Sequence, residues 1–213
     1  MTDRRAIHSP NPNSLLIEKV RAAIGAGVDW VQKREKDMAG TELLNLTRAA
    51  IAASCDAAAG KKDSPRIIVN DRLDVALAAD ADGVHFGSES VPIQEAVRWI
   101  RKGNAPRNFL VGFSCHGLEE AKRAEDAGVD YLFFGPVFET PSKLSFGSPQ
   151  GLQRLKKVCE AVTIPVLAIG GVGEDNAHAC IRAGAAGIAA IRLFQELQPD
   201  LLRETVMRLR SSA

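Results

Sequence analysis

The stretch Asp126-Ala127-Gly128-Val129-Asp130, followed by the apolar run Tyr131-Leu132-Phe133-Phe134, decides the fold class of this sequence. Its glycine lies where a helix should end, because glycine readily adopts the left-handed backbone of a C-terminal cap. The apolar run is continuous rather than alternating, which is typical of a parallel strand buried on both faces. Similar connections recur at Ala26–Asp29, Ala79–Gly83 and Arg182–Gly187. Such repetition indicates successive βα units.

Apolar runs along the chain are predicted to be seven strands, at residues 28–32, 66–70, 83–86, 109–113, 131–135, 165–169 and 187–191. Amphipathic segments are predicted to be eight helices, at residues 14–24, 40–58, 72–79, 92–101, 118–127, 151–161, 174–183 and 199–209. This alternation predicts an α/β fold, a (β/α)8 TIM barrel that forms a single domain over residues 1–213. A doubly wound sheet is the competing architecture. Only residues 1–8 are available for the strand before the first helix, so we expect that strand to be truncated.

The composition is that of an ordinary globular protein. The 27 Lys and Arg residues and 26 Asp and Glu residues leave a net charge of +1, which argues against a general attraction to nucleic acid or to a membrane surface. The four cysteines form no C-x-x-C pair and no zinc-finger spacing, which predicts reduced thiols and a cytoplasmic location. No apolar run reaches the length of a membrane span. The sequence leaves the oligomeric state open between a monomer and a homo-oligomer.

Polar residues and glycines concentrate where the predicted strands end. The active site of a TIM barrel is built from the loops that follow the strands. In this sequence those positions carry Gln32–Lys36, Asn70–Asp71, His85–Ser90, Ser114–Gly117, Gly135–Gly147, Gly170–Gly171 and Arg192. The strand starts show no such concentration. We therefore expect a site for phosphorylated small molecules at the C-terminal ends of the strands.

Two of these segments have the chemistry of an anion site. Glycines at 170 and 171 would let backbone N–H groups approach a phosphate, although a tight turn into the next helix also explains them. Alternation along an extended segment places Gln32, Arg34 and Lys36 on one side, which makes the two cations candidate phosphate ligands. The alternative for residues 33–37 is a solvated run of charges.

Further candidates come from single residues. Asp71 is a candidate Mg2+ ligand or a helix N-cap, and Asn70 orients a ligand or satisfies the loop backbone. His116 is a candidate general acid or base, with a hydrogen-bonded loop histidine as the alternative. His85 lies inside a strand and is interpreted as structural, and Cys115 is expected to point into the barrel wall rather than to act as a nucleophile. The long loop with Thr140, Ser142 and Lys143 is either an anion-holding lid or a plain loop.

Taken in order along nearly the whole chain, these residues resemble the thiamin phosphate synthase family and its TenI-type thiazole tautomerase branch. The matching phrases are Val31-Gln32-Lys33-Arg34-Glu35-Lys36, Val69-Asn70-Asp71-Arg72, Asp82-Gly83-Val84-His85, Gly112-Phe113-Ser114-Cys115-His116, Phe134-Gly135-Pro136-Val137-Phe138-Glu139-Thr140 and Ala168-Ile169-Gly170-Gly171-Val172. As a set they are far more specific than any one motif.

The resemblance implies a transferase of thiamin biosynthesis that joins hydroxymethylpyrimidine pyrophosphate to thiazole phosphate and releases pyrophosphate, with Mg2+ as cofactor. It implies that Gln32, Arg34 and Lys36 contact the pyrimidine and the pyrophosphate. It further implies that Asp71 holds Mg2+, and that the pyrophosphate is bound by Asn70, Ser114 and Lys143. The thiazole phosphate would be met by Thr140, Ser142 and Gly171, with Gly170 beside them.

Two departures from the family pattern concern the anion sites. The synthase pattern has a second Mg2+-binding aspartate in the loop after residues 83–86, and Ser90 stands in its place, with Glu89 adjacent. Serine carries no charge, so the metal site is one carboxylate short. Arg192 replaces a small serine near the thiazole phosphate, where it would either clamp the phosphate or fill the pocket. Thr2-Asp3-Arg4 resembles the end of the family's first strand.

Because of these departures, two other functions remain as alternatives. The tautomerase branch moves a proton on a thiazole carboxylate phosphate and needs no pyrophosphate metal site, and His116 matches its acid/base histidine. Gln32 and Lys143 favour the synthase pattern. We therefore predict a thiamin phosphate synthase, with the tautomerase and a non-catalytic phosphate-binding homologue as alternatives.

Overall fold

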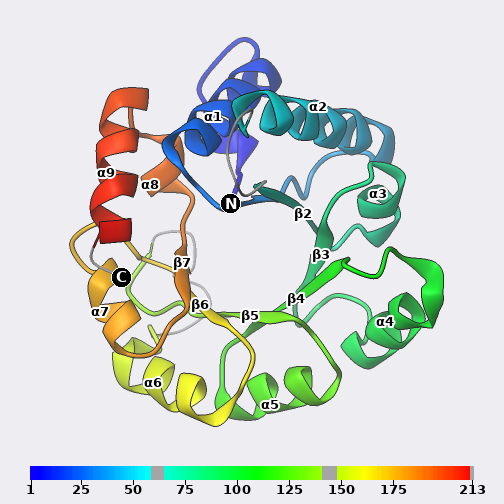
Figure 1. Ribbon diagram of the computed structural model, residues 1–213, viewed down its shortest axis with the longest axis vertical. Coiled ribbons are helices and arrows are strands. Elements are labelled where there is room, and N and C mark those ends of the chain that lie inside the picture. Colours follow the sequence, from blue (N-terminus) through cyan, green and yellow to red (C-terminus); the bar gives the residue numbers. More distant parts are fainter. Residues whose placement is uncertain (59–64, 141–147, 212–213) are drawn as a thin grey trace. The chain divides into compact units, whose positions relative to one another are not determined.

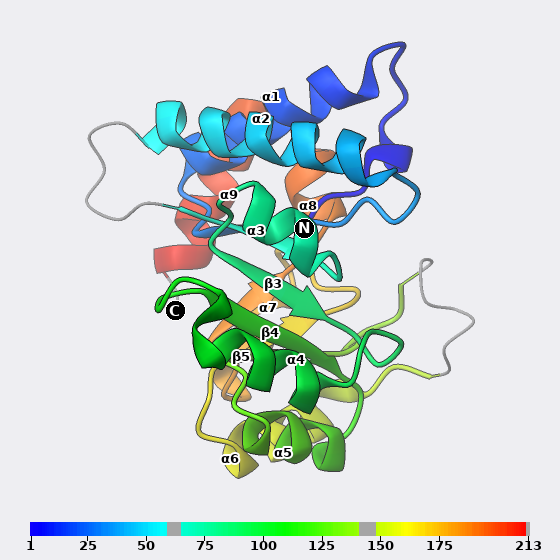
Figure 2. The same ribbon diagram turned by 90° about the vertical axis from the view of Figure 1, so that its right-hand side faces the viewer.

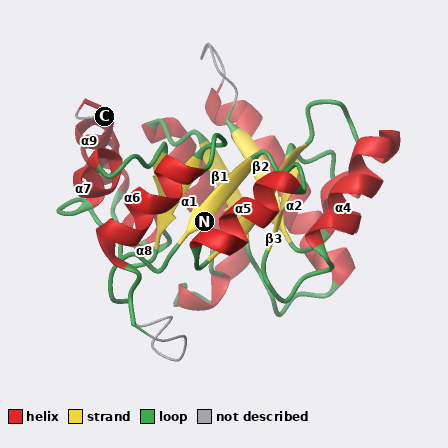
Figure 3. Ribbon diagram, turned by 90° about the horizontal axis from the view of Figure 1, so that it is seen from below, coloured by secondary structure: helices red, strands yellow, loops and turns green. Residues whose placement is uncertain are grey.

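The structure is a computed structural model that describes residues 1–58, 65–140 and 148–211. Strands and helices alternate along the chain, as predicted (Figures 1 and 3). The hydrogen-bonded strands follow one another in sequence order from β1 to β7, which is the strand order of a TIM barrel. The internal contacts group into two compact units. Unit 1 comprises Met1–Val84 and Ile191–Ser211, and unit 2 comprises His85–Ala190.

Unit 1 contains the first strands of the chain and its last helices. Its elements are η1 (Arg4–Ala6), α1 (Pro12–Ala26), β1 (Trp30–Lys33), α2 (Gly40–Ala58), β2 (Arg66–Asn70), α3 (Leu73–Ala78), α8 (Arg192–Gln195) and α9 (Pro199–Ser211). Strand β1 pairs in parallel with β2, so that Gln32 lies opposite Ile68. Helices α1 and α2 lie side by side (Figures 1 and 2).

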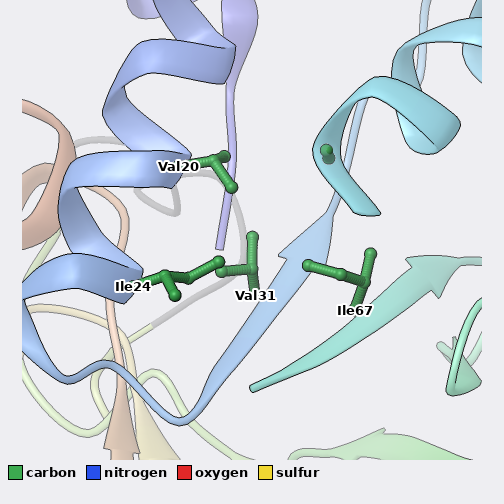
Figure 4. Packing of buried hydrophobic residues seen from close by; sticks show 5 residues of the cluster. Val20, Ile24, Val31 and Ile67 are labelled. Carbon is green, nitrogen blue, oxygen red and sulfur yellow. The ribbon is translucent and has the colours of Figure 1, made fainter. Parts of the chain in front are cut away.

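The core of unit 1 lies between these two helices and the strand pair. Val31 of β1 and Ile67 of β2 pack against Val20 and Ile24 of α1 and Ala50 of α2, and all five side chains are buried (Figure 4). Because side chains alternate along a strand, Val31 and Lys33 face these helices, and Gln32 lies on the opposite face of β1. Packing with the helices therefore decides which face of β1 is left for polar chemistry.

Unit 2 continues the alternation. Strand β3 (Gly83–Phe86) is divided between the units, and its last two residues belong to unit 2. The other elements of unit 2 are α4 (Ile93–Trp99), the π-helical turn η2 (Ile100–Asn104), β4 (Leu110–Cys115), α5 (Leu118–Asp126), β5 (Tyr131–Phe134), α6 (Gly151–Ala161), β6 (Val166–Ile169), α7 (Ala177–Arg182) and β7 (Gly187–Ala189). Strands β4 to β7 pair in parallel with their neighbours, with Ser114 opposite Phe133. Helix α5 lies next to α6 (Figure 2).

The recurring helix-to-strand connection has a physical explanation in both units. Gly27, Gly128 and Gly184 have φ values of 107°, 89° and 99°, the left-handed backbone that favours glycine. The aspartate that ends the connection ties it to the preceding strand. Asp82 accepts a hydrogen bond from the Ile67 N–H at 2.7 Å, and Asp130 accepts one from the Val111 N–H at 2.6 Å.

The predicted elements agree with the structure apart from their ends and two details. Each predicted strand is present, with bounds shifted by two residues or fewer, but the short helix α8 was not predicted. Residues 1–8 form no strand, although the Thr2 N–H donates to the Gln32 carbonyl of β1 at 2.9 Å. The single-domain organisation stays a prediction. None of the helices in the described ranges is both long and apolar enough to cross a membrane.

Candidate active site

In unit 1, three polar side chains form a hydrogen-bonded series at the ends of β1 and β2. The Gln32 Nε2 donates to Asn70 Oδ1 at 2.9 Å, and the Asn70 Nδ2 donates to Asp71 Oδ2 at 2.6 Å. Gln32 is buried, whereas Asp71 is exposed and has a positive φ of 59°. The buried Gln32 Oε1 has no hydrogen-bond partner among the described residues. The series therefore presents an unused acceptor at its buried end and a carboxylate at its exposed end.

The backbone of Asp71 opens the turn into the next helix. Its carbonyl accepts from the Leu73 N–H at 3.1 Å, and α3 begins at Leu73 with Arg72 at the N-cap position. Because Arg72 and not Asp71 occupies that position, the N-cap interpretation of Asp71 was wrong. The carboxylate instead accepts the Asn70 amide and is held at the exposed end of the series.

The alternative interpretation, a solvated run of charges over residues 33–37, holds only in part. Lys33 is fully buried and Glu35 is 5% exposed, whereas Lys36 and Asp37 are exposed. The Lys33 Nζ lies 3.8 Å from Glu35 Oε1. Burial lowers the pKa of the Lys33 ammonium to about 8, and the Glu35 carboxylate offsets only part of this effect. Lys33 and Glu35 thus lie on one buried side of the segment.

The N-terminal residues are tied to this buried carboxylate, a connection that sequence reasoning missed. The Thr2 Oγ1 donates to Glu35 Oε1 at 2.6 Å, and the Arg4 N–H donates to Glu35 Oε2 at 2.8 Å. The Thr2 hydroxyl also accepts from the backbone N–H of Arg34 at 3.0 Å. Arg34, a predicted anion ligand, is therefore held through its backbone while its side chain is partly exposed.

In unit 2, a buried histidine connects two hydroxyl groups on neighbouring strands. The His85 Nε2 lies 2.8 Å from the Ser114 Oγ, and the His85 Nδ1 lies 3.1 Å from the Tyr131 hydroxyl. His85 is 1% exposed, and burial lowers its pKa to about 3, so its ring is neutral. His85 lies within a strand, as predicted, but its polar contacts with Ser114 and Tyr131 were not anticipated.

His116 follows β4 and is also held by hydrogen bonds within unit 2. Its Nδ1 lies 2.5 Å from the Gly135 carbonyl, and its backbone N–H donates to Glu120 Oε2 at 2.6 Å. A carbonyl only accepts, so Nδ1 carries the proton in this contact, and Nε2 is the ring nitrogen left for another partner. Cys115 is fully buried, and burial raises the pKa of its thiol to about 12, which disfavours the reactive thiolate form.

Gly170 and Gly171 have positive φ values of 90° and 66°, and both are closely approached by the chain that follows β5. A Cβ at Gly170 would lie 2.5 Å from the Cα of Pro136, and one at Gly171 would lie 2.4 Å from the carbonyl oxygen of Glu139. The Gly171 carbonyl accepts from Asn176 Nδ2 at 3.0 Å. Backbone packing therefore requires glycine at both positions, and the phosphate-binding role stays a prediction.

The other predicted site residues are more dispersed. The Ser90 Oγ accepts from the Gly87 N–H at 2.8 Å and so closes a turn after β3. Thr140 is partly buried, and Ser142 and Lys143 lie outside the described residues. Arg192 is exposed at the start of α8 in unit 1. Within the described ranges, no group of three His, Cys, Asp or Glu side chains is placed to hold a metal ion.

A protein-family model described as thiamine monophosphate synthase matches residues 3–194. A thiamine-phosphate synthase from Moorella thermoacetica is 43% identical over 175 residues, covering 82% of this chain and 78% of the relative. A thiamine-phosphate synthase from Roseiflexus sp. is 40% identical over 191 residues, covering 90% of this chain and 75% of the relative. The solved structure of a thiamine phosphate pyrophosphorylase from Pyrococcus furiosus matches with a TM-score of 0.81 and 34% identity, covering 99% of this chain and 92% of that one.

Proposed function

The chain belongs to the thiamine monophosphate synthase family, and from this premise we propose that it joins hydroxymethylpyrimidine pyrophosphate to thiazole phosphate. Such an enzyme is a transferase of thiamine biosynthesis. In the reaction, the bond between the pyrimidine methylene carbon and the pyrophosphate breaks, and a bond between that carbon and the thiazole forms. The protein must therefore hold two phosphorylated substrates and stabilise a leaving pyrophosphate.

The observation that carries the proposal is the series Gln32–Asn70–Asp71. The Gln32 amide donates to Asn70, and its buried Oε1 has no partner among the described residues. A buried polar atom without a partner is costly, so a ligand that donates to it is favoured. We assign this acceptor to an N–H group of the pyrimidine. The side chains of Arg34 and Lys36 then contact the pyrophosphate, where fixed positive charge offsets the growing negative charge.

The donor set at the exposed end of the series suits Mg2+. Magnesium prefers oxygen ligands and is commonly held by one or two carboxylates together with substrate phosphates. The exposed Asp71 carboxylate would hold it, and Asn70 orients that carboxylate through the 2.6 Å hydrogen bond. When bound, Mg2+ neutralises charge on the departing pyrophosphate. Asn70 thereby serves the pyrophosphate site through Asp71 as well as by direct contact.

Unit 2 supplies the remaining proposed ligands except Arg192, which belongs to unit 1. Ser114 binds the pyrophosphate, together with Lys143. His116 is retained as a catalytic candidate because Nδ1 is held by the Gly135 carbonyl and Nε2 is left for another partner. The thiazole phosphate is assigned to the following residues: Thr140, Ser142, Gly170, Gly171 and Arg192. The Gly171 N–H supports this assignment, because no partner for it is found among the described residues.

The test measures pyrophosphate release by the purified protein supplied with both substrates and Mg2+. We expect release that depends on Mg2+. Asp71→Asn should lower the rate by about tenfold or more, the usual scale for a disturbed metal site. Asp56→Asn, which changes an exposed carboxylate at the end of α2, should not change it.

Other outcomes would reject the proposal in distinct ways. Absence of release, combined with tautomerisation of a thiazole carboxylate phosphate that His116→Ala abolishes, would identify the tautomerase instead. Binding of both phosphates without either reaction would identify a non-catalytic homologue.

A further inference from the structure

The two hydrogen bonds of His85 in unit 2 each run from a donor to an acceptor, and the tautomer of the ring decides which group donates. A neutral imidazole carries one proton, so one ring nitrogen donates a hydrogen bond and the other accepts one. His85 contacts a hydroxyl at each nitrogen, Ser114 at Nε2 and Tyr131 at Nδ1. The location of the single ring proton therefore decides whether the Ser114 oxygen accepts from the ring or donates to it.

The two directions have opposite consequences for an anion at Ser114. If Tyr131 donates to Nδ1, the proton lies on Nε2 and is donated to the Ser114 oxygen, which leaves the Ser114 O–H free to donate to an anion. If the ring proton lies on Nδ1, the Ser114 O–H is consumed by Nε2. The serine then offers only lone pairs, which repel a phosphate oxygen. Only the first arrangement makes Ser114 useful for binding pyrophosphate.

The backbone of β4 is shaped to allow these contacts. A Cβ at Gly112 would lie 2.5 Å from the His85 Nδ1 and 2.2 Å from the Tyr131 ring, so any other residue there would separate the two groups. The Phe133 ring packs on His85 with centroids 4.3 Å apart. Tyr131 and His85 are each 1% exposed. The imidazole is thus confined by packing and shielded from water, so its tautomer is set by its neighbours.

We propose that Tyr131 and His85 are positioning residues that make Ser114 a hydrogen-bond donor to the leaving pyrophosphate. The order of donation runs from the Tyr131 hydroxyl to His85, from His85 to Ser114 and from Ser114 to the anion. This inference rests on the proposed role of Ser114 as a pyrophosphate ligand. It extends the site to two buried residues that touch neither substrate.

The first test is a double-mutant cycle that combines Tyr131→Phe with Ser114→Ala. Tyr131→Phe removes one oxygen and keeps the ring. We measure pyrophosphate binding by calorimetry in the presence of Mg2+, and kcat for pyrophosphate release. Each single variant should weaken binding and lower kcat by about tenfold, as expected when one hydrogen bond to a charged group is lost. The double variant should be no worse than Ser114→Ala, because the tyrosine acts only through the serine.

Two further variants separate positioning from packing. His85→Gln should restore part of the activity that His85→Leu loses, since an amide accepts through its oxygen and donates through its nitrogen in the same order. Phe133→Leu disturbs the packing on His85 without removing a hydrogen bond. It should lower thermal stability and leave pyrophosphate affinity within about twofold, below the effect of one hydrogen bond.

The outcomes are distinguishable. Wild-type affinity in Ser114→Ala would refute the role of Ser114, and the inference with it. Loss in Ser114→Ala without loss in Tyr131→Phe, or losses that multiply in the double variant, would overturn the positioning role alone. If the variants do not fold, nitrogen-15 NMR of the wild-type protein with pyrophosphate and Mg2+ gives the answer. A proton on Nε2 of His85 is expected, and a proton on Nδ1 would overturn the inference.

Discussion

Lys33 provides a quantitative test of the buried charges in unit 1. Its side chain is fully buried, and its Nζ has no hydrogen-bond partner among the described residues. The Glu35 carboxylate is 3.8 Å away and already accepts hydrogen bonds from Thr2 and Arg4. Burial therefore disfavours the ammonium form, and the pKa of Lys33 falls from 10.5 to about 8 in the folded protein.

This lowered pKa makes stability depend on pH with a definite sign. Between pH 8 and 10.5 the folded protein has released the Lys33 proton and the unfolded chain still holds it. Because the unfolded state binds more protons, the free energy of unfolding rises with pH across this window. The full shift corresponds to about 3–4 kcal/mol, at about 1.4 kcal/mol for each pKa unit. Below pH 8 the cost of the buried ammonium is fully present.

The assay compares urea unfolding of the wild-type protein and Lys33→Met at pH 7.5, 8.5, 9.5 and 10.5. Methionine keeps the length of the side chain without a charge. The wild-type free energy of unfolding should gain about 3 kcal/mol relative to this variant over the series. Lys122→Met, at an exposed lysine of α5, serves as the control and should show a constant difference from wild type. A constant difference for Lys33→Met as well would refute the reasoning.

Two further predictions concern the anion sites. Ser90→Asp should lower the Mg2+ concentration that gives half-maximal pyrophosphate release, because the new carboxylate supplies the charge missing from the family pattern. One of its oxygens can keep the hydrogen bond that Ser90 accepts from the Gly87 N–H. An unchanged Mg2+ titration would contradict this prediction. Gly171→Ala should lower the free energy of unfolding by about 1–3 kcal/mol, since a Cβ would meet the Glu139 carbonyl at 2.4 Å and the positive φ disfavours alanine. It should also raise the KM for thiazole phosphate. Unchanged stability would argue against the packing role of Gly171, and an unchanged KM would argue against its role in phosphate binding.

The strands and helices were predictable because their signals are local. The continuous apolar run at Tyr131–Phe134 and the glycine at 128 are properties of a few neighbouring residues, and the structure has the strand and the left-handed cap at these positions. Helix α8 escaped prediction because its four residues are too few for a helical period to appear. The bounds of β1 shifted because Val28 and Asp29 belong to the connection that precedes the strand.

The candidate site was predictable as a set of residues but not as a set of contacts. Gln32, Asn70 and Asp71 were recognised from their motifs, whereas the hydrogen bonds that join them depend on the register of β1 against β2. The contact between His85 and Tyr131 was missed because 46 residues separate them along the chain. A possible signal was Gly112, a glycine inside a strand, which often marks a close approach of other groups.

The sequence by itself determined the alternation of strands and helices, the positions where polar residues follow the strands, and the family to which the chain belongs. These follow from short-range periodicity, turn chemistry and motif order. The tertiary structure alone decided which charges are buried. Residues 33–37 look like a solvated run, yet Lys33 and Glu35 are buried, because packing of β1 against α1 and α2 selects the face on which alternate side chains lie. Burial and hydrogen-bond direction arise from contacts between distant segments, and no local pattern contains them.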